Sequence, residues 1–183
     1  MSARETVMWL LGVQALIGAF DTLYFHEWKA RLPAMGPAAH SELRLHWMRS
    51  MIYAVVFAVL PWWEPQGVWA GVIMALLVAE IFITVADFVV EDTVRAPLGG
   101  VYPGERATHT VMAILHGSIL AFWVPLLWVG VSEPTACVWS PAAVPEWLRW
   151  AFVLLSAGVF ISGWRDLYAS TGRPGSSWPW PRS

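Results

Sequence analysis

The chain has 183 residues, of which 57% are hydrophobic and only 13% are charged, and its formal net charge is −2. Soluble domains average about 25% charged residues, so this composition argues against a soluble protein and indicates one integral membrane domain. The basic residues are scattered, which argues against nucleic-acid binding, and the single cysteine, Cys137, excludes an internal disulfide or a multi-cysteine metal site.

Five apolar segments are long enough to cross a bilayer, which takes about 20 residues per helix. They cover residues 6–25, 43–60, 67–90, 108–131 and 147–164. The sequence therefore predicts an all-α integral membrane protein with five transmembrane helices and a four-helix bundle core. We expect a single domain over residues 1–165, followed by an irregular Pro/Trp-rich cytoplasmic tail over residues 166–183.

The basic residues predict how the helices are oriented, because Lys and Arg near helix ends favour the cytoplasmic side. Of the 11 Lys and Arg residues, only Arg4 and Arg149 fall on the side opposite to the other nine. We therefore expect a multi-pass protein of the inner (cytoplasmic) membrane, with its N-terminus outside and its C-terminus in the cytoplasm. Its predicted surroundings are the lipid bilayer, and no protein partner is predicted.

Acidic residues and histidines gather toward the predicted cytoplasmic end. The stretch "LLVAEIFITVADFVVED" carries Glu80 and Asp87, and the next segment carries His109 and His116, with a spacing of seven in both cases. A spacing of seven keeps side chains on one face of a helix. Counted from the connection between the two helices, Asp87 should lie opposite His109 and Glu80 opposite His116. Since a carboxylate at a membrane helix centre costs about 2.5–3.5 kcal/mol, we expect these residues to pair inside the bundle.

Carboxylate and imidazole ligands projecting inward from four helices are typical of di-iron and di-manganese proteins, and a mixed His/carboxylate shell with open positions suits non-haem iron. The sequence therefore predicts a metal site near the cytoplasmic face, with iron as the metal, up to two ions per chain, and manganese or zinc as alternatives. Glu80 and Asp87 are separated by about 10 Å along their helix, so a dinuclear cluster and two separate single-metal sites both remain open. The predicted ligands are Asp21, His46, Glu80, Asp87, His109 and His116, with Glu42, Glu91, Glu105 and His26 as a second tier and Arg49 as a residue that orients ligands.

All four residues of the second tier are expected near water. Glu42, Glu91 and Glu105 lie at predicted helix ends, and His26 lies in a connection, where it is expected to be solvated. This placement makes them weaker candidates for ligands than the deeper residues.

The predicted activity is that of a non-haem di-iron membrane oxidase or hydroxylase acting on a lipid-soluble molecule. Three alternatives remain: a b-type haem electron-transfer protein in which His46 and His109 or His116 hold the iron, a proton-coupled carrier, and a structural acid–imidazole network without metal. The stretches "HEWKARLP" and "HSELRLH" differ from the H-x-x-H-H boxes of histidine-box membrane hydroxylases, so no residue role is taken from that family.

Overall fold

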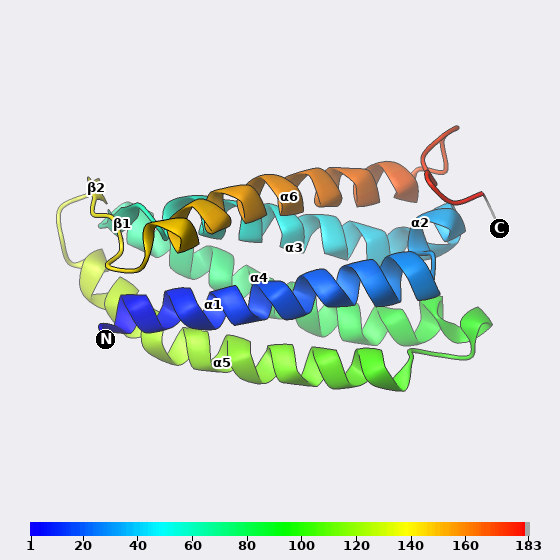
Figure 1. The fold of residues 1–183 in the computed structure, drawn as a ribbon, viewed down its shortest axis with the longest axis horizontal. Helices are drawn as coiled ribbons and strands as arrows, with labels where there is room; N and C mark the ends of the chain where they lie inside the picture. The colour runs from blue at the N-terminus through cyan, green and yellow to red at the C-terminus, as the bar shows by residue number, and fades with distance from the viewer. Residues whose placement is uncertain (182–183) are drawn as a thin grey trace.

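The structure, a computed structural model, describes residues 1–181 and confirms the all-α class. Five long helices lie side by side, and the chain termini are at opposite ends of the bundle (Figure 1). We call the end that carries the C-terminus the C-terminal end. The long helices are α1 (Ala3–Phe20), α3 (His40–Val59), α4 (Val68–Val94), α5 (Pro103–Val131) and α6 (Glu146–Ser170).

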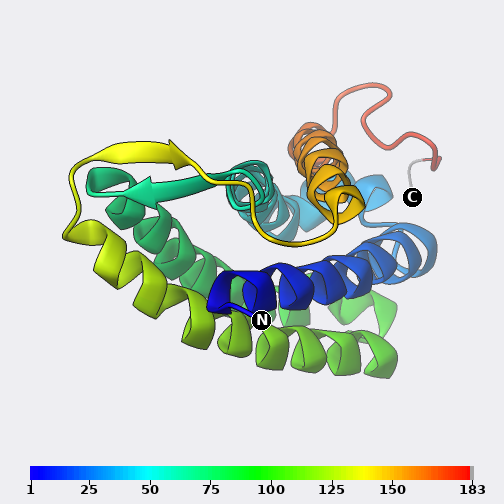
Figure 2. The same ribbon diagram turned by 60° about the vertical axis from the view of Figure 1, so that its left-hand side comes forward.

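Short elements join the long helices at the two ends. At the C-terminal end, the π-helix η1 (Asp21–Lys29) continues α1, and α2 (Leu32–Met35) and the 3₁₀-helix η2 (Gly36–Ala39) lead into α3. Another 3₁₀-helix, η3 (Ala96–Leu98), lies between α4 and α5. At the opposite end, β1 (Trp63–Gln66) and β2 (Ala136–Trp139) form an antiparallel pair (Figure 2).

Several helices are suited to crossing a membrane, as expected for a multi-pass membrane protein. By length and apolarity, four spans qualify among the described residues: Ala3–Lys29, Val68–Val94, Pro103–Val131 and Glu146–Ser170. Helix α3, the second of the five predicted spans, is not in this set, because its 20 residues include the charged Glu42, Arg44 and Arg49. It packs against α4 and α6, so protein rather than lipid covers much of its surface.

The predicted helix boundaries differ from the structure by several residues, as in α6 and α5. Helix α6 extends to Ser170 and therefore includes the first residues that we placed in the tail, and α5 begins at Pro103 rather than at residue 108. The remaining tail folds back on η1, where Trp180 Nε1 donates to Glu27 Oε2 at 3.2 Å. Residues 182–183 of the predicted tail lie outside the described residues.

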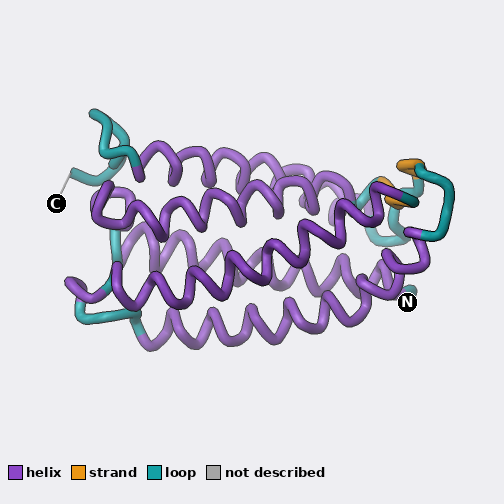
Figure 3. The backbone as a smooth tube through the Cα atoms, turned by 180° about the vertical axis from the view of Figure 1, so that it is seen from behind, coloured by secondary structure: helices purple, strands orange, loops and turns teal. Residues whose placement is uncertain are grey.

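Two apolar clusters enclose a polar layer inside the bundle. The larger one includes Leu11 and Ile83, and the smaller one, nearer the C-terminal end, includes Val94. On α4, the acids Asp87 and Glu91 lie between Ile83 and Val94 and are buried. The helices run the full length of the molecule, with loops confined to its ends (Figure 3). The fold therefore holds ionisable groups in the interior, between two apolar regions.

Candidate metal centre

The π-helix η1 brings Asp21 and His26 to one side of the chain. In an α-helix, residues five apart point about 140° away from each other. A π-helix has i→i+5 hydrogen bonds and a wider turn, so residues five apart lie nearly above one another. Asp21 and His26 are 3% and 5% exposed, and Nε2 of His26 lies 3.2 Å from Oδ2 of Asp21.

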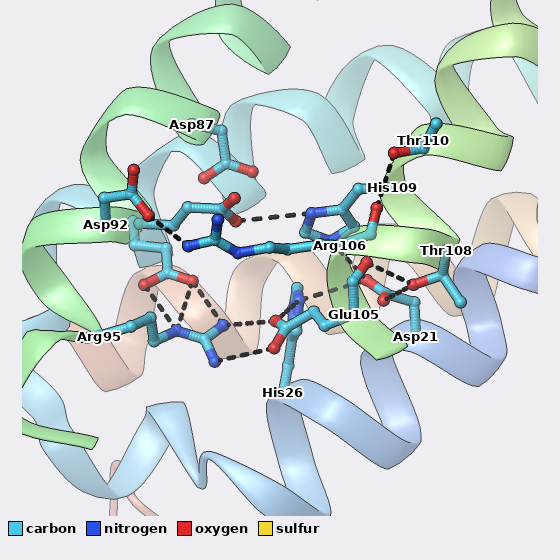
Figure 4. Close-up of polar contacts among 12 residues, drawn as sticks. Asp21, His26, Asp87, Asp92, Arg95, Glu105, Arg106, Thr108, His109 and Thr110 are labelled. Atoms are coloured by element: carbon cyan, nitrogen blue, oxygen red, sulfur yellow. Dashed lines mark hydrogen bonds and ion pairs between the residues drawn. The ribbon is translucent and has the colours of Figure 1, made fainter. Parts of the chain in front are cut away.

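Helix α5 supplies the third member of the group, His109. Its Nε2 lies 3.1 Å from the same Asp21 Oδ2, and Thr108 donates a hydrogen bond of 2.7 Å to the other oxygen of Asp21 (Figure 4). One donor atom each from Asp21, His26 and His109 lie within 4.8 Å of one another, and all three residues are buried. These three residues therefore form a group that could hold a metal ion.

The spacing of these atoms fits ligands around a single ion. Two ligand atoms that are each about 2.1 Å from a metal and about 90–109° apart are separated by about 3.0–3.4 Å, and the separations from Asp21 are 3.1 and 3.2 Å. Although carboxylate oxygens of Asp21 and Glu105 lie near Nε2 of His26, this buried nitrogen has no well-directed hydrogen-bond partner among the described residues. The oxygens thus lie to the side of the N–H direction of the His26 ring, as neighbouring ligands of a shared ion would. Nε2 of His109, by contrast, forms a directed hydrogen bond with Oδ2 of Asp21.

Two further carboxylates contact the histidines of this group. Oε1 of Glu105 lies 3.1 Å from Nε2 of His26, and Oε2 of Glu91 lies 3.5 Å from Nδ1 of His109. A carboxylate on the second ring nitrogen of a histidine fixes the tautomer and the orientation of the ring when the first nitrogen binds a metal. Glu91 is close enough to pair with His109, although Nδ1 of His109 has no directed hydrogen bond among the described residues.

Arg95 binds two buried carboxylates, Glu42 and Glu105. Its guanidinium lies between Glu42, at 2.7 Å, and Glu105, at 3.0 Å, and all three side chains are completely buried (Figure 4). Burial by itself disfavours the charged guanidinium, but hydrogen bonds and ion pairs with these carboxylates outweigh that effect and raise the pKa of Arg95 above its ordinary value. The sequence analysis did not place Arg95 among the buried ionisable residues, because a lone arginine at a helix end is typical of the membrane–water interface.

The predicted ligands His46 and Asp87 lie next to the group. The ring of His46 stacks on that of His26, with centroids 4.7 Å apart, and its Nε2 lies 3.4 Å from Asp87 Oδ2. Arg49 pairs with the same Asp87 oxygen at 3.0 Å. The predicted pairing of Asp87 with His109 was wrong, because α1 and η1 pack against α5 and place Asp21 next to His109.

The deepest predicted pair does meet. Nε2 of His116 lies 2.9 Å from Oε2 of Glu80, and Tyr53 of α3 contacts both residues at 3.3 Å. Gln14 donates to the Tyr53 hydroxyl at 2.7 Å. The structure therefore places Glu80 and His116 in a second polar network, farther from the C-terminal end.

The second-tier residues were expected near water, and this expectation was wrong. Glu42 and Glu105 are 0% exposed, Glu91 is 7% exposed and His26 is 5% exposed. The reason is the segment from η1 to η2, which folds over the C-terminal end and packs with α6 against the helix ends. Only His40 among the five histidines is exposed.

The buried layer carries more negative than positive fixed charge. Five buried carboxylates on η1, α3, α4 and α5 are accompanied by two arginines, which leaves three uncompensated negative charges when the histidines are neutral. A further buried acid, Asp166 of α6, adds to this excess when it is ionised. Uncompensated charge in a protein interior is strongly destabilising, so the layer requires either bound cations or protonated imidazoles. The residues counted are Asp21, Glu42, Asp87, Glu91 and Glu105, with Arg49 and Arg95.

Comparison with known proteins identifies no relative: no protein-family model, no curated protein and no solved structure matches this chain. The function must therefore be argued from the geometry of the buried layer.

Proposed function

We propose that this chain is a membrane metalloprotein that binds an iron ion through Asp21, His26 and His109 and acts as an oxidoreductase on a lipid-soluble molecule. The observation that carries the proposal is the donor set. Two imidazoles and one carboxylate that leave other coordination positions open are the ligands of non-haem Fe(II) oxygenases, and one donor atom from each of the three residues lies within 4.8 Å of the others.

The chain's own residues have distinct tasks in this proposal. Asp21 and His26 come from η1 and His109 from α5, so the ion would join α1 to α5. Glu91 would orient His109, while Arg95 holds Glu105 next to His26. Bound iron supplies the activation of dioxygen, and the surrounding apolar clusters exclude water from the site. A substrate dissolved in the bilayer would reach the site between the helices.

The donor geometry favours this reading over a b-type haem. An axial histidine needs the haem plane directly beyond its ligating nitrogen. Yet a carboxylate oxygen lies 3.4 Å from Nε2 of His46, 3.1 Å from Nε2 of His109 and 2.9 Å from Nε2 of His116.

Metal analysis and an absorption spectrum of the purified protein in mild detergent test the proposal. We expect iron without a Soret band, and we expect Asp21→Asn to lose the iron of this site while the protein stays folded. Nitric oxide added to the reduced protein should give the EPR signal of a non-haem iron–nitrosyl, since it binds where dioxygen would. A Soret band, zinc in place of iron, or a folded metal-free protein would each overturn the proposal.

A further inference from the structure

The network around Glu80 and His116 lies apart from the group of Asp21, His26 and His109. His116 follows His109 by seven residues on α5, which places the two histidines about 10 Å apart along the helix axis. Metals that share bridging ligands lie about 3.5–4 Å apart. Whatever compensates the charge of Glu80 must therefore be separate from an ion bound at Asp21.

The Glu80 carboxylate is buried at a depth where an uncompensated charge is costly. Glu80 is 4% exposed, and it lies near the middle of α4. The nearest arginine, Arg49, is engaged with Asp87 at 3.0 Å. Thr84 and Tyr53 give hydrogen bonds to Oε1 of Glu80, but neither residue carries a positive charge. The side chain that faces the other oxygen, Oε2, is His116.

The hydrogen bonds of Tyr53 determine which nitrogen of His116 carries a proton. The phenol oxygen accepts from Gln14 Nε2 and has one proton of its own, which it donates to Oε1 of Glu80. Nδ1 of His116, at 3.3 Å from the phenol, then takes part only as a donor. In a neutral imidazole this leaves Nε2, which lies 2.9 Å from Oε2 of Glu80, with a lone pair that is free to bind a cation.

The contact between Nε2 of His116 and Oε2 of Glu80 is close but is not a hydrogen bond. The atoms are 2.9 Å apart, yet both are buried and neither has a hydrogen-bond partner among the described residues. The line that joins them therefore lies off the N–H direction of the ring. Two ligands about 2.1 Å from one ion and about 90° apart are separated by about 3.0 Å, which matches this contact.

From this geometry we infer a second metal position, at which Oε2 of Glu80 and Nε2 of His116 share a divalent first-row transition-metal ion. Water or a small ligand completes the coordination. Tyr53 is a positioning residue, because it fixes the tautomer of His116 in the way that outer hydrogen bonds fix ligating histidines in metal sites. The chain would then carry two separate single-metal sites rather than one dinuclear cluster.

Anaerobic titration of the apoprotein with Fe²⁺ tests this inference, with bound iron measured after gel filtration. We expect about two ions per chain for the wild type, about one for Glu80→Gln or His116→Gln, about one for Asp21→Asn, and about none for Glu80→Gln combined with Asp21→Asn. Thr84→Val is the matched control, because Thr84 contacts Glu80 without facing His116, and it should keep both ions. Tyr53→Phe should keep both ions but bind the deeper one about 10–100-fold more weakly.

The outcomes separate the inference from the proposed function. A wild type that binds a single ion, lost in Asp21→Asn and retained in Glu80→Gln, overturns the second position and supports the proposed site. An ion lost in Glu80→Gln and retained in Asp21→Asn supports the second position and overturns the proposed site. Full binding in both His116→Gln and Glu80→Gln, with the variants monodisperse, means that a protonated imidazole compensates Glu80 and overturns the inference.

Discussion

At the scale of single residues, the candidate site depends on a local departure from α-helical geometry. Asp21 and His26 share a face because η1 is a π-helix, and π-helical turns recur at functional sites. A continued α-helix would direct the two side chains about 140° apart. The sequence shows both residues but not the π-helical turn. His26 was therefore expected to be solvated in a connection rather than to face Asp21.

Glu91 and its neighbour Asp92 allow a matched test of ligand orientation. Glu91 is buried with Oε2 at 3.5 Å from Nδ1 of His109, whereas Asp92 is exposed and pairs with Arg106. If Glu91 orients a ligating His109, Glu91→Gln should weaken metal binding at that site about 10–100-fold. Asp92→Asn should leave binding unchanged. Dissociation constants from metal competition would check this, and equal effects of the two substitutions would contradict the orienting role.

Arg95 should be the residue whose loss destabilises the buried layer most. Arg95→Met leaves Glu42 and Glu105 without their cation, and removal of one partner from a buried ion pair costs about 3–5 kcal/mol. Arg106→Met is the control, because its pair with Asp92 is exposed on both sides and exposed pairs contribute little. Thermal or denaturant unfolding in detergent measures the difference, and similar stabilities of the two variants would show that Arg95 is not a structural clamp.

At the scale of elements, the apolar segments predicted the long helices well, because each is a run of hydrophobic residues with clear ends. Helix α3 was the exception: it was predicted as a span, but it carries charges and packs between α4 and α6. Seven-residue spacing correctly put Glu80 and His116 within reach of each other. It failed for Asp87 and His109, because the sequence does not reveal which neighbouring helix each face contacts.

Two glycines of α6 provide a test of the α3–α6 contact. A Cβ at Gly163 would lie 2.7 Å from Ser50 Cβ, whereas a Cβ at Gly158 would meet no atom within 4 Å. Gly158→Ala should therefore raise stability by about 0.5–1 kcal/mol, since glycine is unfavourable inside helices. Gly163→Ala should lower stability because α3 and α6 must separate. Melting temperatures of the two variants check this, and a stabilising Gly163→Ala would contradict the close packing.

At the scale of the whole molecule, the distribution of Lys and Arg leads us to propose that the C-terminal end faces the cytoplasm. The segment η1 and the tail lie at that end, while the β1–β2 pair lies at the other (Figure 1). The polar layer includes Asp21 and His26 of η1. A metal site near the C-terminal end would then exchange ions with the cytoplasm.

Cys137 reports on this orientation, because it is the single cysteine, lies in β2 and is exposed. A membrane-impermeant maleimide should label it from the outer side of the membrane that holds the protein. Moving the thiol to the opposite end, with Cys137→Ser and Ala38→Cys together, should abolish that labelling until this membrane is opened. The reverse pattern would place the N-terminus in the cytoplasm.

The central claim is that Asp21, His26 and His109 jointly bind one metal ion, and the bound iron of the His26→Gln variant tests it most directly. His40→Gln is the natural comparison, because His40 lies outside the buried layer and is exposed. We predict that His26→Gln loses the ion at this site while His40→Gln retains the full wild-type content, with both proteins folded. Full iron content in His26→Gln, or equal losses in the two variants, would contradict the account.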